Sequence, residues 1–409
     1  MKNFGTLFYY ELKKLFQRKL SWVAVLALSG FCVFGVFKHG AVGSAFIAPV
    51  FDENGNETGE TRVISGEEIY ATYLKTEGTL DGRVMDDAFF QEMLDNVPEP
   101  GKGFDQAVYF ATEDATYQTA FGMVTGLLSE PRNVTAEKFY AAQWEQTRIY
   151  CETWGGNGQT QGILSPAEVD YWMEQATKIE RPFVYHDDWR GASYFMDYCY
   201  TLLGLLPVAG AVCVCTAFSE DRRMRMDALV FTTRKCRVPL YLAKALAGAV
   251  MATLAGLVIV TSVVVAFLVV WGTYGLDASF QMYYFVNPRP DAIWQILLPM
   301  LALLVLYTIL CSGVSMLVSA LTRSSLVALA VPVLLVQVLD RWHLPAYGWT
   351  GYLPQNLLGW NGPLNVDLVN IFGVYLTNFQ FGPLLYLGIT LVLLALCWLG
   401  WQRNARGAG

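Results

Sequence analysis

Charged side chains are scarce in this 409-residue sequence. They make up 15% of the chain, compared with about 25% in an ordinary soluble domain, whereas 54% of the residues are apolar. The mean hydropathy is +0.35. This balance excludes a disordered chain, a coiled coil and a basic nucleic-acid-binding protein, and it favours an integral membrane protein.

Motifs for disulfide scaffolds, metals and nucleotides are also missing. The acidic segment 39–193 contains a single cysteine, Cys151, so no disulfide framework is predicted for it. No CxxC, HExxH or Cys/His cluster of zinc spacing occurs, and we read His186-Asp187-Asp188 as a polar linker rather than a metal site. The nucleotide-binding pattern GxxxxGK[ST] is absent, and no convincing set of catalytic residues is present. We therefore expect neither a metal nor a catalytic centre.

The charges that are present divide the chain into two parts. Residues 39–193 contain 26 acidic and 10 basic side chains, a net charge of −16. The remaining residues contain 9 acidic and 18 basic side chains, a net charge of +9. This asymmetry predicts an acidic, water-facing domain joined to a basic and apolar membrane domain.

Six apolar segments are candidates for membrane-spanning helices. A span needs about 20 apolar residues, because the hydrocarbon layer is about 30 Å thick. The weakest candidate is the fifth, which is short and contains Pro332. The first is predicted to be a retained anchor rather than a cleaved signal peptide, because its charged lead is long. The six predicted spans are 20–38, 194–218, 240–273, 292–321, 324–340 and 383–402.

Lysine and arginine predict the orientation of these spans. Fourteen lysines and arginines lie in the N-terminal lead, the loop after the second span, the turn after the fourth span and the C-terminal tail, which all face one side of the membrane. The short loops on the opposite side, 274–291 and 340–382, contain only Arg289 and Arg341. By the positive-inside rule, both termini are cytoplasmic and 39–193 is extracytoplasmic, in the plasma membrane. No acidic side chain lies deep in a span, which argues against a carrier driven by protons or sodium.

The first 19 residues are predicted to form an amphipathic helix in the membrane interface. Apolar side chains recur at helical spacing beside basic ones, although a helical positive-inside flank would look similar. We single out Phe4, Phe8, Glu11, Lys13, Lys14 and Arg18.

The cytoplasmic loop 219–239 is the other informative stretch. Its roughly twenty residues are too few for a nucleotide-binding domain, so any energy must come from elsewhere. Ser219 can cap a short helix with Glu220 and Asp221 in its first turn, and apolar side chains follow. The loop is either a docking element for a partner or a solvated positive-inside loop. Its residues alone support the two interpretations equally.

Taken together, these stretches resemble a known family. The stretch Phe4-Gly-Thr-Leu-Phe-Tyr-Tyr-Glu-Leu-Lys-Lys-Leu-Phe16 leads into the spans, Phe218-Ser-Glu220 and Ala228-Leu-Val-Phe-Thr-Thr-Arg-Lys-Cys-Arg237 bound the loop, and Lys244 opens the third span. This order is similar to the membrane subunit of an ABC transporter of the ABC-2 (type V) exporter class, over about 250 residues.

The resemblance implies that residues 219–237 contact a separate ATPase subunit, with Glu220 and Arg237 as anchors. It also implies a dimer, either with a second copy or with a different permease, and a path lined by the second and fifth spans. ATP and magnesium would bind the ATPase subunit, so this chain would hold no cofactor. The residues assigned to coupling are Glu220, Asp221, Arg222, Arg223, Arg225, Asp227, Leu229, Arg234 and Arg237.

The water-facing segment is predicted to be an α-rich α+β domain. A hairpin is expected over 48–64, around Asn54-Gly55. Capping patterns at Ser65 and Ser165 predict helices, and the second should end at Arg181, before Pro182. Helices are also expected over 84–96, 104–128 and 135–151. The aromatic loop 341–382 could be re-entrant or could lie at the headgroups.

The fold class we expect is an all-α polytopic membrane protein with six spans, an interfacial helix and this extracytoplasmic domain. The leading function is the permease subunit of an ATP-driven exporter, not itself an enzyme, for a hydrophobic or amphipathic lipid, peptide or antibiotic. Membrane lipid is an expected partner, and nucleic acid is not. The alternatives are an extracytoplasmic sensor or envelope assembly scaffold without transport, and, less favoured, a polytopic membrane enzyme.

Overall fold

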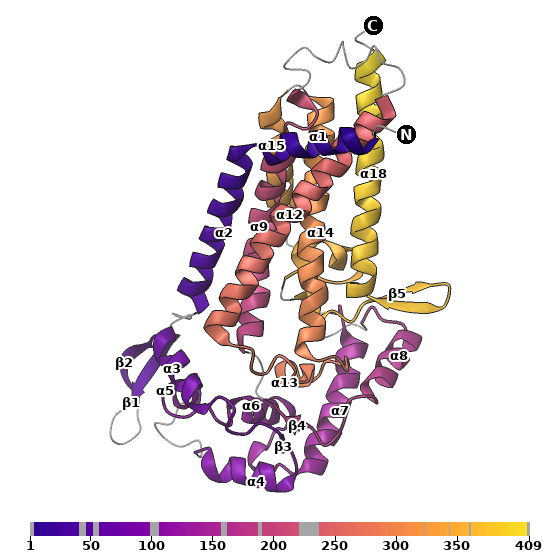
Figure 1. Cartoon of the computed structure of the whole chain (residues 1–409). Helices are drawn as coiled ribbons and strands as arrows, with labels where there is room; N and C mark the ends of the chain where they lie inside the picture. The colour runs from indigo at the N-terminus through magenta and orange to yellow at the C-terminus, as the bar shows by residue number, and fades with distance from the viewer. Residues whose placement is uncertain are drawn as a thin grey trace. The chain divides into compact units, whose positions relative to one another are not determined.

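The chain is mostly helical, and its described residues form three small antiparallel sheets of two strands each (Figure 1). The computed structural model describes residues 4–40, 46–51, 57–98, 106–156, 162–186, 190–220, 237–322, 324–342, 344–359 and 361–406. It divides into two compact units. We call residues 1–34, 196–265 and 298–409 the bundle unit, and residues 35–195 and 266–297 the inserted unit.

Long apolar helices dominate the bundle unit. Five helices in the described part of the chain are long and apolar enough to cross a membrane, one fewer than the six expected. The exception is α15, whose 17 residues rise about 25 Å, somewhat less than the hydrocarbon thickness. The five long helices are α2 (Lys19–Gly40), α9 (Arg190–Val214), α12 (Arg237–Trp271), α14 (Ile293–Leu321) and α18 (Asn378–Arg406). They are accompanied by α15 (Ser325–Arg341) and by the N-terminal helix α1 (Phe4–Phe16).

Small residues let these helices approach closely. A Cβ on Gly210 of α9 would lie 2.5 Å from Ser312 Oγ and 3.0 Å from the Thr308 carbonyl oxygen, both in α14. Gly256 of α12 similarly faces Thr308, where a Cβ would lie 3.0 Å from Oγ1. Small residues at helix crossings are typical of membrane proteins, where close backbone packing holds helices together.

The segment between α15 and α18 combines short helices with a hairpin. The aromatic loop predicted over 341–382 therefore has regular structure, and its hairpin was not foreseen. The elements are η2 (Gly348–Tyr352), α16 (Pro354–Leu357), α17 (Asn361–Leu364), β5 (Leu368–Ile371) and β6 (Val374–Thr377). Whether this segment is re-entrant stays a prediction.

The inserted unit is a mixture of helices and short strands. Its first stretch runs from the β1–β2 hairpin to the strand β4, which pairs with β3, and its second stretch contains the short helix α13. The elements are β1 (Phe46–Phe51), β2 (Glu57–Ile64), α3 (Gly66–Thr76), β3 (Arg83–Val84), α4 (Asp87–Asn96), α5 (Gln106–Thr112), α6 (Gln118–Leu127), η1 (Pro131–Asn133), α7 (Ala136–Thr153), α8 (Pro166–Ala176), β4 (Val184–Tyr185) and α13 (Phe280–Tyr283).

Local sequence signals account for several of these elements. The antiparallel pairing of β1 and β2 confirms the predicted hairpin, while Asn54 and Gly55 of its expected turn lie outside the described residues. Ser65 caps α3 by accepting from the Glu68 amide, and Ser165 and Glu168 form the predicted capping box of α8. The expected end of α8 at Arg181 was wrong, because the helix stops at Ala176. The Arg181 guanidinium donates to the Ala176 carbonyl at 3.2 Å. It therefore satisfies a carbonyl that a backbone amide of a further helical turn would otherwise have bonded.

The connection between α12 and α14 completes the inserted unit. Gln143 of α7 donates to the Phe285 carbonyl at 2.9 Å. The buried Arg289 guanidinium stacks on Trp172 of α8, 5.2 Å from the ring centre. Burial in this apolar setting lowers the pKa of Arg289. The water-facing domain predicted over 39–193 is therefore built from two separate stretches of the chain.

Candidate functional site

The N-terminal helix α1 lies across the direction of the long helices, at one end of the bundle unit (Figure 1). It is amphipathic, as the sequence predicts: Leu15 is buried, Phe4 and Phe8 are partly buried, and Lys13 is exposed. Tyr9, Tyr10 and Phe16 are apolar side chains that it also exposes. Exposed aromatic and basic side chains on one helix suit the boundary between lipid and water.

A buried ion pair fastens α1 to the bundle. The Lys244 side chain in α12 is 1% exposed, and its Nζ lies 3.0 Å from Glu11 Oε2. The same ammonium donates to the Ala217 carbonyl at 3.2 Å, just after α9 ends. A lysine is rarely buried unless its charge is paired, and here Glu11 supplies the opposite charge. One ammonium thus joins three segments that are distant in sequence.

Two further contacts tie α1 to the segment that follows α9. Lys14 Nζ lies 3.3 Å from Glu220 Oε2, and the Arg18 guanidinium donates to Thr216 Oγ1. We name the six residues Glu11, Lys14, Arg18, Thr216, Glu220 and Lys244 the α1 clamp. It brings together four residues singled out from the sequence as interfacial or coupling residues, together with Lys244 of the family-like pattern.

The segment around Phe218 is also held by contacts with α12, α14 and α18. Ser319 Oγ of α14 accepts hydrogen bonds from the backbone amides of Phe218 and Ser219, at 3.3 and 3.1 Å. The Phe218 ring packs against Tyr241 of α12 and Trp401 of α18, with ring centres 5.8 and 5.4 Å apart. The step Phe218-Ser-Glu220 is therefore a junction between α1, α12, α14 and α18.

Much of the predicted coupling loop lies outside the described residues. Asp221, Arg222, Arg223, Arg225, Asp227, Leu229 and Arg234 fall in the undescribed range 221–236, and Arg237 is the first residue of α12. The loop leaves from the α1 clamp at Glu220 and returns to the start of α12. Thr216 and Ser319 were not foreseen, since a small hydroxyl residue in an apolar run carries no distinctive signal.

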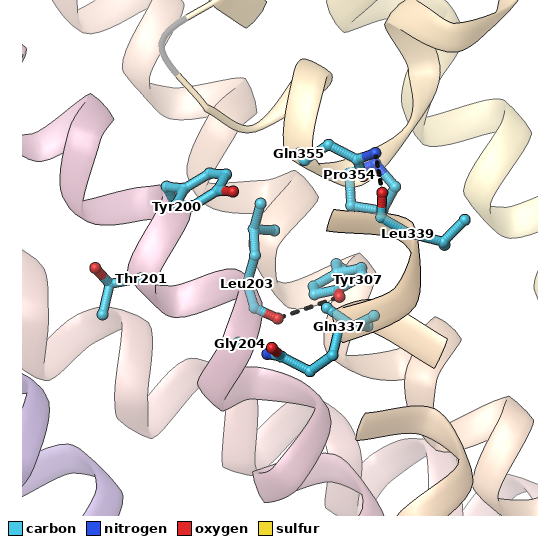
Figure 2. A pocket seen from close by; sticks show the side chains of 10 residues that line it. Tyr200, Thr201, Leu203, Gly204, Tyr307, Gln337, Leu339, Pro354 and Gln355 are labelled. Atoms are coloured by element: carbon cyan, nitrogen blue, oxygen red, sulfur yellow. Dashed lines mark hydrogen bonds between the residues drawn. The ribbon is translucent and has the colours of Figure 1, made fainter. Parts of the chain in front are cut away.

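A cavity of about 280 Å³ lies elsewhere in the bundle unit, between α9, α14, α15 and α16 (Figure 2). Tyr307 of α14 donates to the Leu203 carbonyl at 3.2 Å, and Gln355 donates to the Leu339 carbonyl at 3.4 Å. Gln337 of α15 extends beside Gly204 (Figure 2). The lining residues are Tyr200, Thr201, Leu203, Gly204, Tyr307, Val336, Gln337, Leu339, Pro354 and Gln355.

The chemistry of this cavity is uncharged and amphipathic. Aromatic and aliphatic side chains form much of the wall, while two glutamine amides and two tyrosine hydroxyls supply hydrogen-bonding groups. Its volume lies just below the range of about 300–1,000 Å³ that is common for small-molecule sites. It can accommodate a small molecule, or one portion of a larger amphipathic one.

No metal site is visible in the described part of the chain, where no three His, Cys, Asp or Glu side chains converge. His186, the residue considered for a cation, instead lies 2.6 Å from Asp81 through its Nδ1. Its sequence neighbours Asp187 and Asp188 lie outside the described residues.

The helices and their composition define the class of this protein. Long apolar helices within the described ranges make it a polytopic membrane protein. No known protein family matches the chain, and no curated protein is significantly similar to it.

Proposed function

We propose that this chain is the permease subunit of an ATP-driven exporter whose ATPase is a separate subunit. ATP and magnesium would bind that subunit, and this chain would supply the path through the membrane as a dimer, with a second copy or a related permease. The observation that carries the proposal is the α1 clamp, which fixes an amphipathic helix to the origin of the loop 221–236.

The clamp suits the transmission of force. A push on the loop would reach α1 through Glu220 and Lys14, and α12 through Lys244. The packing of Phe218 against Tyr241 and Trp401 extends the same connection to α18. Because the Lys244 ion pair is buried, the junction would move as one body rather than yield locally.

The basic flanks support a cytoplasmic position for the clamp and both termini. Lysine and arginine gather in the lead into α2, in the loop 219–239 and in the last turns of α18. This asymmetry is the usual mark of the cytoplasmic side in a plasma membrane, and the acidic inserted unit would then be extracytoplasmic.

The cavity supports a hydrophobic or amphipathic substrate. It lies between α9 and α15, which correspond to the second and fifth predicted spans, and its walls hold no charged side chain. A lipid, a peptide or an antibiotic with an apolar portion matches this lining better than an ion or a charged metabolite.

Co-purification tests the proposal directly. The tagged chain is extracted in mild detergent, and its partners are identified by mass spectrometry for the wild type and for Glu220→Arg. The pair of Glu220 with Lys14 is partly exposed, at 27% and 38%, so both the loss of the pair and the new like-charge contact with Lys14 are screened by solvent, and we expect the bundle to stay folded. The matched control is Glu137→Arg, a charge reversal at an exposed position of α7.

The proposal expects an ATPase subunit with the wild type and with Glu137→Arg, and its loss with Glu220→Arg. Recovery of envelope proteins bound through 39–193, without an ATPase, would instead favour the sensor or scaffold, which the size and acidity of that segment motivate.

A further inference from the structure

The hairpin β5–β6 presents an apolar tip to its surroundings. Ile371 and Val374 form the last pair of the ladder, and Phe372 and Gly373 make the two-residue turn. The Phe372 side chain is 103% exposed, and Ile371 and Val374 are exposed beside it. No charged side chain occurs anywhere from Leu368 to Gln402, so the apolar tip has no charged neighbour within the hairpin.

The turn places a phenylalanine where glycine or asparagine is usual. Phe372 has φ of 51° and Gly373 has φ of 88°, the left-handed values that a tight hairpin turn of this kind needs. Such turns favour Asn-Gly, because a bulky side chain rarely adopts a positive φ. Asn370 Oδ1 supports the turn by accepting from the Gly373 amide at 2.8 Å. Because the Phe372 ring is fully exposed, packing within the bundle unit does not offset the cost of its positive φ.

The position of the hairpin indicates what it meets. Strand β6 ends at Thr377, and α18 begins at the next residue, so the hairpin joins directly to a membrane-spanning helix. Figure 1 shows the hairpin projecting sideways from this end of α18, across the helix direction. Where α18 crosses a bilayer, a hairpin with that direction would lie along the membrane surface, where the headgroups meet the acyl chains.

Two exposed tryptophans nearby in the sequence also suit the boundary between headgroups and acyl chains. Trp342 follows α15, and Trp349 lies in η2; both are exposed. Aromatic side chains gather at the boundary between lipid and water, because their rings are apolar and their edges polar. Lys and Arg are absent from the hairpin, so headgroup charge contributes nothing to its attraction.

We propose that the β5–β6 hairpin is a lipid-binding element, which inserts Phe372 into the interface of the same bilayer that α18 spans. The bound partner is phospholipid, contacted by the tip residues Ile371, Phe372 and Val374. The hairpin would fix the depth and tilt of α18. This inference rests on the membrane character of the chain and does not depend on an ATPase partner.

Photo-crosslinking in the full chain identifies the partner. The photoreactive residue p-benzoylphenylalanine replaces Phe372, and the protein is illuminated in phosphatidylcholine–phosphatidylglycerol nanodiscs and in native membranes. Replacement of Leu391, an exposed residue within α18, serves as the positive control for lipid. Replacement of Gln91, exposed on α4 near acidic side chains, serves as the negative control.

The expected result is a phospholipid adduct on the hairpin peptide, as at Leu391 and unlike Gln91. An adduct with a second copy of the chain or with another protein would overturn the proposal, as would no adduct at Phe372 when Leu391 gives one.

A second variant covers the case in which the crosslinker disturbs the turn. With the crosslinker at Val374, Phe372→Asn keeps a residue that suits a positive φ and removes the ring. We expect the lipid adduct at Val374 to fall several-fold. An unchanged yield would show that the ring does not anchor the hairpin.

Discussion

Lys244 and Glu11 are 233 residues apart in the chain, yet their charged groups lie 3.0 Å from each other. Lys244 is almost wholly buried near the start of α12, while Glu11 is on the helix that lies across the end of the bundle. Because an unpaired ammonium cannot stay buried at low cost, α12 requires α1 in place. The position of α1 is thus built into the bundle rather than left to the lipid alone.

Breaking this ion pair should release α1. We expect Glu11→Gln, which removes the carboxylate that Lys244 contacts from α1, to cost about 3 kcal/mol of docking free energy. That corresponds to amide hydrogen exchange in α1 faster by on the order of a hundredfold. Hydrogen exchange read by mass spectrometry measures it, with Lys13→Met as the control, since Lys13 is exposed on the same helix. If the double variant Glu11→Gln/Lys244→Met loses at least as much docking free energy as its two single variants lose together, the two charges are not coupled.

Close packing of α9 and α14 should make Gly210 intolerant of a methyl group. A Cβ there would lie 2.5 Å from Ser312 Oγ, so Gly210→Ala should destabilise the bundle by about 1–3 kcal/mol. Gly204, on the same helix, meets only Gln337 Nε2 at 3.9 Å, so Gly204→Ala should be tolerated. Thermal unfolding in detergent compares the two. Equal stability of both variants would show that α9 and α14 are not packed as closely as the structure has them.

The cavity provides a test of the path. Gly204→Phe should fill much of it and abolish substrate-stimulated ATP hydrolysis by the proposed complex, while the ATPase subunit still co-purifies. Gly388→Phe is the matched control, because Gly388 in α18 also has open space around its Cβ position. Full stimulation with Gly204 replaced would place the path elsewhere in the bundle.

Acid should weaken one contact in the inserted unit in a defined range. Arg83 and the Tyr117 hydroxyl both bind the Glu92 carboxylate, with contacts of 2.7 Å, and together they lower its pKa from 4.5 to about 2. A lowered carboxyl pKa adds stability that is fully present above pH 4.5 and is lost as the pH falls towards 2. The gain is modest, because the pair is partly exposed.

Hydrogen exchange of α4 in the full chain checks this pH range. Amides of α4 should exchange faster in Glu92→Gln than in the wild type at pH 7, and the difference should vanish between pH 4.5 and 2, after correction for intrinsic rates. A difference that persists undiminished at pH 2 would mean that the charge of Glu92 is not its source.

The sequence predicts the helices of the bundle well, because long uncharged runs such as 293–321 admit few other structures. It also places Glu11 and Lys244 among the notable residues, since charges beside or within apolar stretches stand out. It cannot predict that the two meet, because periodicity specifies the faces of a helix and not its tertiary partner. The early end of α8 likewise depends on a side chain five residues away, Arg181 binding the Ala176 carbonyl.

The hairpin β5–β6 escaped prediction for a different reason. Its turn is Phe372-Gly373, whereas the common signal for such a turn is Asn-Gly or Asp-Gly. The flanking residues are apolar on both faces of the strands, so the alternation that marks a half-buried strand is weak. An element that meets lipid on its outside has little need of that alternation.

We propose that a separate ATPase subunit drives this membrane chain, and native mass spectrometry of the complex released from its own membrane detects that subunit if it is present. We expect an assembly of two permease chains, identical or related, with two ATPase subunits that release phosphate from ATP. An assembly without any ATP-hydrolysing subunit, or the chain alone under conditions that preserve other membrane complexes, would contradict it.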